Sequence, residues 1–414
     1  MHPTPPAQIP NKTELVANMK TTILFLILLL ALSALADSLH VSLAGHIDTP
    51  GQAWGVYVSG SYAFVADDTC GLRIIDVSTP SAPIEISYCD TPGEAQAVYI
   101  SGSYAYIADG DYGLRIFEIS DAFSPVVKGS LNTDGYARDI FVTDSLAYIS
   151  CDTFGLRIID VSNPNSPVEI SAYRNDWYIR SSYIVDSYAF LANGSRGLRI
   201  IDISDPVHPS LVGFYDTEWS AKNVFVYGNF AFVNTEGGVQ IINISIPSIP
   251  SLTSYYTGSA IEDVYIEEDY MYLADRYPGM LSVIDISNPS IPLPVGLYDL
   301  PDMVYDVFIS GDYAYAANRF DGLYILDVSY FTGIEEKPSA KPEAFDISAY
   351  PNPFNGNCRL MIEDCGMGID AIEVFDINGR MVEELPRLAS LGTPSLAKGN
   401  SPLKRYRAEK QGEN

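Results

Sequence analysis

A unit of about 42 residues occurs seven times along the chain, and this repeat limits the possible folds more than any other feature. Its most constant part is Gly-Leu-Arg-Ile-Ile-Asp, first seen at Gly71 and last seen, in altered form, at Gly322. The final residue of this motif recurs at Asp76, Glu118, Asp160, Asp202, Asn243, Asp285 and Asp327. Repeats of this length that hold several strands are typical of β-propeller blades.

Each unit contains four short β-type runs, named A to D here. In the first full unit they cover residues 56–59, 62–66, 72–77 and 84–88. Strand C is apolar at nearly every position, as expected for a sheet that is covered on both faces. A Ser-Gly-Ser turn joins A to B, and a turn with Pro ends strand C because Pro cannot donate to the ladder.

The number of strands indicates how the ring closes. Strands A, B and C occur seven times, but no strand D follows the seventh strand C at residues 323–328. A run similar to strand D, residues 41–47, precedes the first strand A. The sequence therefore predicts an all-β fold, a seven-bladed propeller over residues 37–330 with four-stranded blades. Its N-terminal strand completes the last blade and removes an open edge.

The N-terminal region has the pattern of a signal peptide. Lys20 is followed by an apolar run at residues 23–32 and by Ala34-Leu35-Ala36, a small-residue cleavage pattern. We expect residues 1–36 to be removed, with Met19 as a possible true start. The run is too short for a membrane span, and we expect none in the mature chain. A net charge of −28 argues against nucleic acid as a partner.

The repeat resembles a known family. Tyr-Ala-Tyr-Ile-Ala-Asp from Tyr104, followed by Gly-Leu-Arg from Gly113, is similar to the LVIVD repeat of bacterial surface proteins, and the similarity covers about residues 50 to 330. The resemblance implies a propeller and an extracellular setting. It implies no defined reaction.

The C-terminal region has a different character. Residues 331–346 have the composition of a linker. Residues 347–386, with Tyr-Pro-Asn-Pro-Phe-Asn from Tyr350 and Val-Phe-Asp-Ile-Asn-Gly-Arg from Val374, resemble the sorting domain of the type IX (Por) secretion system. That resemblance implies a small β-sandwich, secretion machinery as a partner and a bacterium with an outer membrane. Residues 387–414 depart from it and are expected to be a disordered tail, which a frameshift or truncation would explain.

Candidate binding residues lie in the D-to-A segments, which reach the same face as the B-to-C loops. This face varies from blade to blade, as a working surface does on a rigid scaffold. Exposed aromatic rings there suit stacking on sugars or anchoring a protein. The alternative is that these rings extend the core over the rim. The aromatic candidates are Trp54, Tyr136, Trp177, Tyr178, Trp219 and Tyr305.

A second candidate set stands at the start of each strand A, around the central channel. Arg138, Arg180 and Lys222 occupy this place in consecutive blades and could form a cationic arc for an anionic group. Gln96 and Glu262 share the position. The alternative is solvated charge, balanced by the neighbouring Asp residues.

Those neighbours, Asp139, Asp263 and Asp306, could instead collect a cation such as calcium. Asp109-Gly-Asp111 is a second candidate. Neither has the spacing of a full calcium loop, and Asp is also common in turns. Apart from possible calcium, no cofactor is expected. The five Cys show no repeated spacing and are interpreted as incidental.

Catalysis is not expected. None of the four His is predicted at the channel, and no nucleophile or phosphate-loop motif is present. The repeated Arg73 and Asp76 positions are better explained by pairing and turn capping, since one active site needs one set. Three hypotheses remain: a secreted or outer-surface module that binds glycan or protein, a structural scaffold of the cell envelope, and a carbohydrate-active enzyme that uses the Asp residues as a pair.

Overall fold

The computed structural model describes residues 38–174, 177–258, 260–332, 372–375, 381–385 and 405–408. The predicted signal peptide lies outside these residues, as do most of the predicted linker and most of the predicted sorting domain. The chain forms two compact units, residues 1–333 and 334–414, and each is described by itself.

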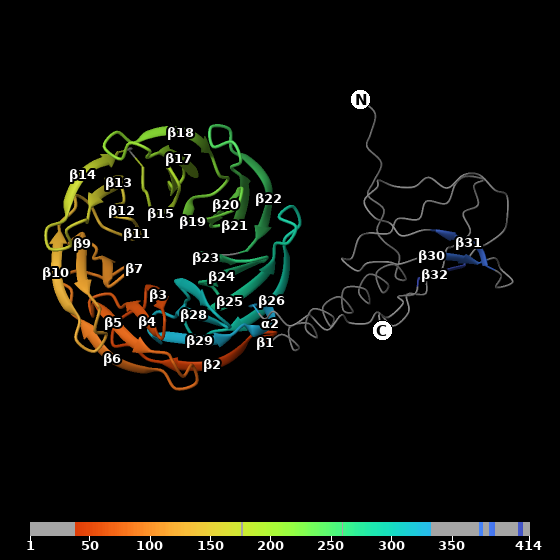
Figure 1. Ribbon diagram of the computed structural model, residues 1–414, viewed down its shortest axis with the longest axis horizontal. Coiled ribbons are helices and arrows are strands. Elements are labelled where there is room, and N and C mark those ends of the chain that lie inside the picture. Colours follow the sequence, from red (N-terminus) through yellow and green to blue (C-terminus); the bar gives the residue numbers. More distant parts are fainter. Residues whose placement is uncertain are drawn as a thin grey trace, which may run out of the picture. The chain divides into compact units, whose positions relative to one another are not determined.

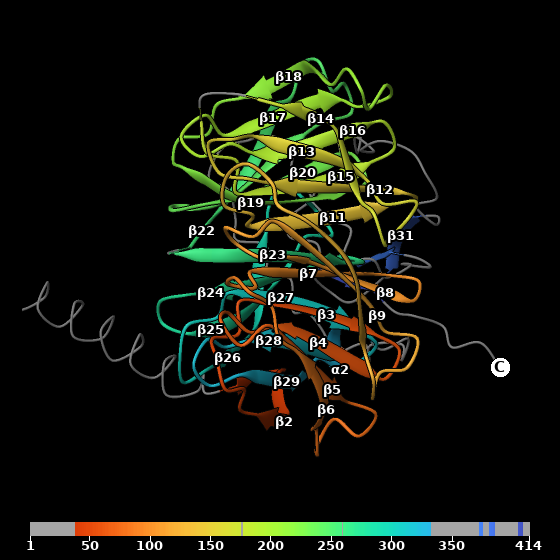
Figure 2. The ribbon, with the colours of Figure 1, turned by 90° about the vertical axis from the view of Figure 1, so that its left-hand side faces the viewer.

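The first unit is a seven-bladed β-propeller, as the repeat predicts (Figure 1). Seven antiparallel sheets stand around a central axis, and Figure 2 shows the resulting disc from the side. In each blade the first strand lies innermost and the fourth lies at the rim. The predicted runs agree with the observed strands to within one or two residues in the first blade.

The strands of blades 1 to 4 are β3 (Gly55–Ser59), β4 (Tyr62–Ala66), β5 (Leu72–Asp76), β6 (Ile84–Cys89), β7 (Ala97–Ser101), β8 (Tyr104–Ala108), β9 (Leu114–Glu118), β10 (Val126–Leu131), β11 (Asp139–Thr143), β12 (Leu146–Ser150), β13 (Leu156–Asp160), β14 (Val168–Tyr173), β15 (Ser181–Val185), β16 (Tyr188–Ala192), β17 (Leu198–Asp202) and β18 (Ser210–Tyr215). Those of blades 5 to 7 are β19 (Ala221–Tyr227), β20 (Phe230–Thr235), β21 (Gly238–Asn243), β22 (Ser251–Thr257), β23 (Ile261–Glu267), β24 (Tyr270–Asp275), β25 (Met280–Asp285), β26 (Leu293–Asp299), β27 (Asp306–Ser310), β28 (Tyr313–Ala317) and β29 (Leu323–Asp327). A short helix, α2 (Ser329–Thr332), follows.

The N-terminal strand closes the ring, which confirms the prediction from the strand count. β2 (Ser42–Ile47) pairs antiparallel with β29 and supplies the fourth strand of blade 7. One detail was not predicted. β1 (Ser38–Leu39) pairs with β26 and gives blade 6 a fifth strand. The strands β1 and β2 therefore join two neighbouring blades.

The core lies between blades, not within them. Seven clusters of buried apolar side chains each combine residues of two adjacent sheets. In one of them Phe64 and Ile74 of blade 1 pack with Val98 and Ile107 of blade 2. Strand C is therefore apolar at successive positions, because each of its faces meets a neighbouring blade.

The innermost strands carry a closed circle of aromatic side chains, here called the aromatic collar. Each strand contributes one ring, and neighbouring ring centroids lie 4.6 to 5.2 Å apart all the way round. Each such contact contributes about 1 kcal/mol beyond its buried area. The collar constricts the central channel. Its members are Tyr57, Tyr99, Phe141, Tyr183, Phe225, Tyr265 and Phe308.

The outer strands touch the next blade at one recurring position. Gly129 has no room for a side chain there, since a Cβ atom would lie 2.2 Å from the carbonyl oxygen of Pro164. In the next blade Ser171 takes the equivalent place, and its hydroxyl donates to the carbonyl of Pro206 at 2.5 Å. The same position thus joins blades either by close backbone approach or by a hydrogen bond.

Buried carboxylates join neighbouring blades near the channel. Asp139 accepts the backbone N–H of Ser182 at 2.9 Å, and Asp306 accepts that of Val56 at 2.7 Å. Asp263 accepts the N–H of Val307 at 3.1 Å. Each bond runs from the start of one strand A to the next blade. These oxygens therefore satisfy buried backbone donors, a role that the sequence did not predict for them.

The same three carboxyl groups have raised pKa values. Burial is the main cause for each of them, since it disfavours the charged form. Asp263 and Asp306 also share a side-chain hydrogen bond, and the negative charge of Asp306 raises the pKa of Asp263 further. The pair therefore holds a proton more firmly than an exposed carboxyl group does.

The second unit is described only through three short strands. β30 (Ile372–Phe375) pairs with β31 (Met381–Leu385) and with β32 (Arg405–Ala408). β32 falls within the segment that the sequence predicts to be a disordered tail. The predicted sandwich as a whole lies outside the described residues. No helix in the described part of the chain is long and apolar enough to cross a membrane.

Removing the closing strand should destabilise all seven blades together. A chain that begins at residue 49 loses the β2–β29 ladder, and we expect its melting temperature to fall by about 10 °C or more. A chain that begins at residue 40 loses only β1 and serves as the control. Calorimetry of both proteins checks this, and equal melting temperatures would contradict closure by β2.

Replacing Asp263 by Asn should change how stability depends on pH. Because its pKa is higher in the folded than in the unfolded chain, protonated Asp263 stabilises the fold below about pH 4, and this is lost as pH rises through the raised pKa. Asn keeps an acceptor for the N–H of Val307 and does not ionise. We therefore expect the melting temperature of Asp263→Asn, relative to wild type, to increase from pH 4 to pH 8.

The control is Asp202→Asn. The Ser204 hydroxyl and N–H lower the pKa of Asp202, so the stabilisation it provides is present above about pH 4 and is lost as pH falls through the lowered pKa. Melting curves at several pH values should therefore show the opposite trend. A pH-independent difference for Asp263→Asn would contradict the assigned shift.

Candidate functional site

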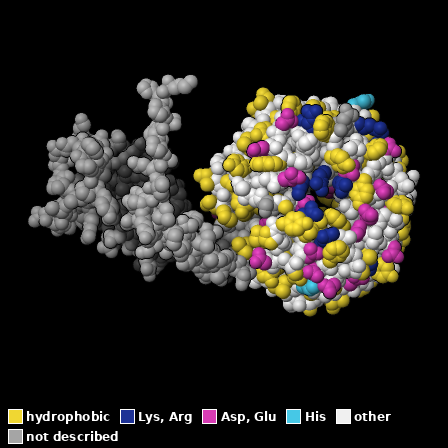
Figure 3. Space-filling view, turned by 180° about the vertical axis from the view of Figure 1, so that it is seen from behind, with side chains coloured by type: hydrophobic (Ala, Val, Ile, Leu, Met, Phe, Trp, Pro, Cys, Tyr) yellow, Lys and Arg dark blue, Asp and Glu magenta, His cyan; other side chains and the backbone are white. Residues whose placement is uncertain are grey.

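The two faces of the propeller differ in the side chains that they present. Most lysine and arginine side chains of the described propeller belong to D-to-A segments or B-to-C loops. Figure 3 shows this face, with Lys and Arg gathered around the hollow at its centre. We call this hollow the mouth. The cations of these segments are Arg138, Arg174, Arg180, Arg196, Lys222, Arg276 and Arg319.

The residues at or just before the start of each strand A occupy equivalent positions at the mouth. The backbone N–H of Arg138 donates to Ser150, and that of Arg180 donates to Ala192, at 2.9 and 3.1 Å. The same bond, from this residue to the end of strand B, recurs in other blades. The structure thus brings the predicted set together in one circle, and Trp54 of blade 1 completes it. The predicted members are Gln96, Arg138, Arg180, Lys222, Glu262 and Tyr305.

The predicted cationic arc is present, but two of its three members are already paired. Arg138 forms an ion pair with Asp152. Lys222 Nζ lies 2.8 Å from Glu262 Oε1, and both side chains are about nine-tenths buried. Arg180 is half-buried and forms no ion pair with any described residue. Arg180 is therefore the member of the arc that is available to an anionic ligand.

Two further cations, which the sequence did not single out, complete the mouth. Arg276 Nη1 lies 3.3 Å from Glu262, which therefore faces two cations. Arg319 Nε donates to Gln52 at 3.0 Å, and within the described residues it has no carboxylate partner. Both arginines come from B-to-C loops of blades 6 and 7. The loop of Arg276 is one residue longer than the repeat, which could have identified it, whereas the loop of Arg319 keeps the usual length and offers no such signal.

The mouth therefore has an excess of positive charge. Asp152 and Glu262 are the carboxylates ion-paired with its cations, and five cations surround it. A third carboxylate, Asp68, has the same loop position as Asp152 and accepts a hydrogen bond from Gln52 Nε2 at 2.9 Å. Outside the mouth, the same face carries exposed carboxylates. They are Asp48, Asp90, Glu94, Asp111, Asp134, Asp216, Glu218, Glu236 and Asp299.

The predicted aromatic residues do not form one continuous surface. Trp54 lies half-buried at the mouth, with its ring centroid 4.1 Å from that of Tyr305. Its Nε1 is buried and has no hydrogen-bond partner among the described residues. Trp177 and Trp219 lie further out, at equivalent places in blades 4 and 5, and each is 42% exposed.

The remaining two aromatic candidates lie beside cations of the arc. The Tyr136 ring lies under the guanidinium of Arg138 at 4.8 Å, and its hydroxyl donates to Glu94 at 2.5 Å. Tyr178 is 51% exposed, two residues before Arg180. In each of three consecutive blades, the D-to-A segment thus combines an aromatic ring with a cation.

The B-to-C loops add aromatic residues that the sequence analysis missed. Tyr112, Phe154, Tyr277 and Phe320 are 41 to 56% exposed. Each stands one or two residues before the glycine of a B-to-C turn, which was the available signal. Every exposed large apolar side chain on this face is aromatic, within the described residues. Exposed aliphatic side chains occur instead on strand D and on the C-to-D turns, as at Ile84, Val127, Ile249, Ile291 and Leu293.

The proposed calcium ligands do not form a metal centre in the described part of the chain, where no group of three or more His, Cys, Asp or Glu could hold an ion. Asp139, Asp263 and Asp306 bond to backbone N–H groups, as described above. Asp109 accepts the N–H of Gly93 at 3.1 Å and lies 3.4 Å from Arg115. These contacts account for the positions of the Asp side chains without an ion.

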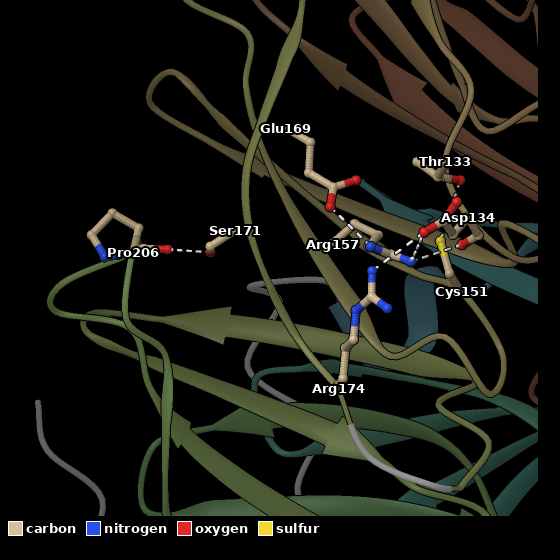
Figure 4. A network of polar contacts seen from close by, with 8 residues as sticks. All are labelled: Thr133, Asp134, Cys151, Arg157, Glu169, Ser171, Arg174 and Pro206. Atoms are coloured by element: carbon tan, nitrogen blue, oxygen red, sulfur yellow. Dashed lines mark hydrogen bonds and ion pairs between the residues drawn. The ribbon is translucent and has the colours of Figure 1, made fainter.

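The repeated arginines are structural, as their repetition indicated. In Figure 4 the buried guanidinium of Arg157 lies between Glu169 at 2.9 Å and Asp134 at 3.2 Å. Arg174 reaches the same Asp134 from the next segment. Asp160 at the end of β13 accepts the N–H of Ser162 and caps the C-to-D turn.

The cysteines of the propeller are free. Cys70, Cys89 and Cys151 form no disulfide, and burial raises the pKa of Cys151 to about 11. Figure 4 shows its sulfur donating to Thr133 at 3.5 Å. Cys358 and Cys365 lie outside the described residues. Cys89 and Cys151 are buried thiols whose pKa values are raised by burial, which makes them poor nucleophiles.

Comparison with known structures supports the fold. A computationally designed protein, Ika8, aligns with a TM-score of 0.53 and 8% identity over 69% of this chain and 99% of its own. The β-propeller domain of Cps50 (Swd1) from Myceliophteria thermophila aligns with a TM-score of 0.57 and 10% identity, over 70% and 99% of the two chains. At such low identity these similarities show the fold alone. Among curated proteins, no sequence matches this chain.

Comparison with protein families confirms the resemblance of the repeat. The family described as LVIVD repeat matches residues 50–91, 92–133, 134–175, 183–217, 220–258, 257–300 and 302–339. These seven matches follow the seven blades and together cover well over half of the chain. The protein belongs to the LVIVD-repeat family.

Proposed function

We propose that this protein is an exported binding module that recognises a glycan or a protein through the face of the propeller that carries the mouth. The observation that supports this most is the segregation of side chains. Cationic groups gather around the mouth, and the large apolar side chains exposed on this face are all aromatic, whereas the opposite face and the rim expose aliphatic as well as aromatic groups. Aromatic and arginine side chains are the types that contribute most to recognition surfaces.

The scaffold suits this role. Interblade clusters, the aromatic collar and the closing strand hold the loops on a stiff base, so that the loops can vary in sequence without loss of the fold. Recognition without catalysis is proposed, because the carboxylates at the mouth are used in ion pairs or in bonds to backbone N–H groups. The described histidines lie in β2, in the C-to-D turn of blade 4 and at His40, away from the mouth.

The proposed location rests on the sequence. The signal-peptide pattern of residues 1–36 and the resemblance of residues 347–386 to a type IX sorting domain support export to the outside of a bacterium with an outer membrane. The secretion machinery is then a partner of the C-terminal region. A structural scaffold in the cell envelope is the second candidate, and the rigidity of the disc supports it.

The test removes the exposed rings from the proposed face. We expect Trp177→Ala/Tyr178→Ala/Trp219→Ala in the full chain to lose at least tenfold in binding on a glycan array and in pull-downs from cell-surface extract, because sugar or protein stacking needs these rings. The matched control, Phe123→Ala/Tyr227→Ala/Tyr255→Ala, removes exposed rings from the opposite face and the rim. It should bind like wild type.

Two outcomes would contradict the proposal. Equal binding by the two triple variants would move the site away from this face. Complete absence of binding by the wild type, with correct folding shown by its melting curve, would favour the scaffold.

A further inference from the structure

The mouth combines features that select one kind of ligand. Its cations come from segments of five different blades, so they surround a common space at the centre of this face. Arg180 and Arg319 have no carboxylate partner among the described residues, and Arg276 shares its partner with Lys222. A single anionic group in the mouth would meet uncompensated positive charge on both sides.

The depth of the mouth is limited. The aromatic collar lies below, and the starts of the inner strands carry buried, hydrogen-bonded carboxyl groups at Asp139, Asp263 and Asp306. A ligand therefore enters from one side and meets a floor of side chains. The end or a short branch of a polymeric ligand fits this geometry better than an internal segment of that ligand.

Charge outside the mouth restricts the ligand further. The surrounding face carries exposed carboxylates, and the whole chain has a net charge of −28. A polyanion would be attracted to the mouth and repelled by its surroundings. The ligand that fits best has one anionic group at its end and neutral groups behind it.

The aromatic side chains indicate what the neutral groups are. Tyr178, Trp219 and Phe320 are exposed on the face that surrounds the mouth, and the described residues of this face present no exposed Val, Leu, Ile or Met side chain. Aromatic faces stack on the C–H groups of sugar rings, whereas a site for a peptide also uses aliphatic contacts.

We infer that the ligand is a glycan that ends in an acidic sugar, whose carboxylate enters the mouth and is bound by Arg180, with Arg276 and Arg319 opposite. This inference rests on the proposed function and specifies its ligand. A guanidinium group can bind both carboxylate oxygens at once, which explains why arginine suits this position. The neutral sugars behind the carboxylate stack on the exposed rings.

The test uses matched pairs of probes with the full-length protein. 3′-Sialyllactose and a glucuronate-terminated trisaccharide are each compared with the methyl ester of the same glycan, with lactose as the neutral reference. Tryptophan fluorescence is a direct readout, because all three Trp lie on this face, and titration calorimetry gives the affinity. We expect at least one acid to bind tenfold or more tightly than its ester, and Arg180→Gln to remove this preference.

Two variants keep the test specific. Arg174→Gln changes an exposed arginine in the same D-to-A segment, away from the mouth, and should leave the preference intact. Arg319→Gln should lower the affinity for the acidic glycan and leave the affinity for its methyl ester unchanged. Melting curves of all variants show whether the fold is kept.

Several results would overturn the inference. Equal affinity for acid and ester, or an unchanged preference in Arg180→Gln, would show that the mouth does not bind the carboxylate. Binding of neutral glycans alone would also overturn it, although the proposed glycan-binding function would stand. Binding of a peptide with a free carboxyl terminus, and of no acidic glycan, would assign the mouth to proteins. If Trp177→Ala/Tyr178→Ala/Trp219→Ala loses binding but Arg180→Gln does not, this face is the binding surface, but Arg180 does not bind a carboxylate of the ligand.

Discussion

The contact between neighbouring inner strands is the interaction on which the rest of the structure depends. Seven aromatic rings, from Tyr57 to Phe308, touch in a closed circle at centroid distances near 5 Å. No blade can leave this circle without breaking contacts on both of its sides. The apolar clusters between blades extend the same arrangement outward, and the β2–β29 pairing closes it through the chain itself. The propeller is therefore one cooperative unit.

The site depends on this unit because its parts come from different blades. Arg180 belongs to blade 4, Arg276 to blade 6 and Arg319 to blade 7, so a rigid ring is needed to keep their separation fixed. Preorganised charges bind a ligand without the cost of ordering them at the time of binding. The exposed rings of the D-to-A and B-to-C segments stand on the same base. The fold and the proposed recognition are linked through this rigidity.

The sequence predicted the repeat, the number of blades, the closing strand and the face with variable loops, because each depends on periodicity along the chain. It also placed Arg138, Arg180 and Lys222 together, since equivalent positions in a propeller meet at the axis. It did not predict that Lys222 and Glu262 would be a buried pair, or that Asp263 would bind a backbone N–H. Such details depend on which side chains meet across two blades, and the period alone does not contain that information.

The aromatic collar shows the same limit. Tyr99 and Phe141 occupy the same position of the repeat, but in the sequence an aromatic residue of an inner strand looks like any other core residue. Only the three-dimensional structure shows that these side chains contact one another in a closed circle. Arg276 and Arg319 were missed because they lie in B-to-C loops, where the repeat has no constant residue type, and the extra residue in the loop of Arg276 was not interpreted. The predicted sorting domain, and with it the export route, lies mostly outside the described residues and remains a prediction.

Native-state hydrogen exchange of the full chain tests most directly whether the blades form one unit around the collar. The amides of β3, β7, β11, β15, β19, β23 and β27 should all exchange through the same global opening, with one common free energy and one common dependence on denaturant. Exchange of any inner strand at a clearly lower free energy than the others would show that its blade opens alone. That result would contradict the account of a rigid mouth built from several blades.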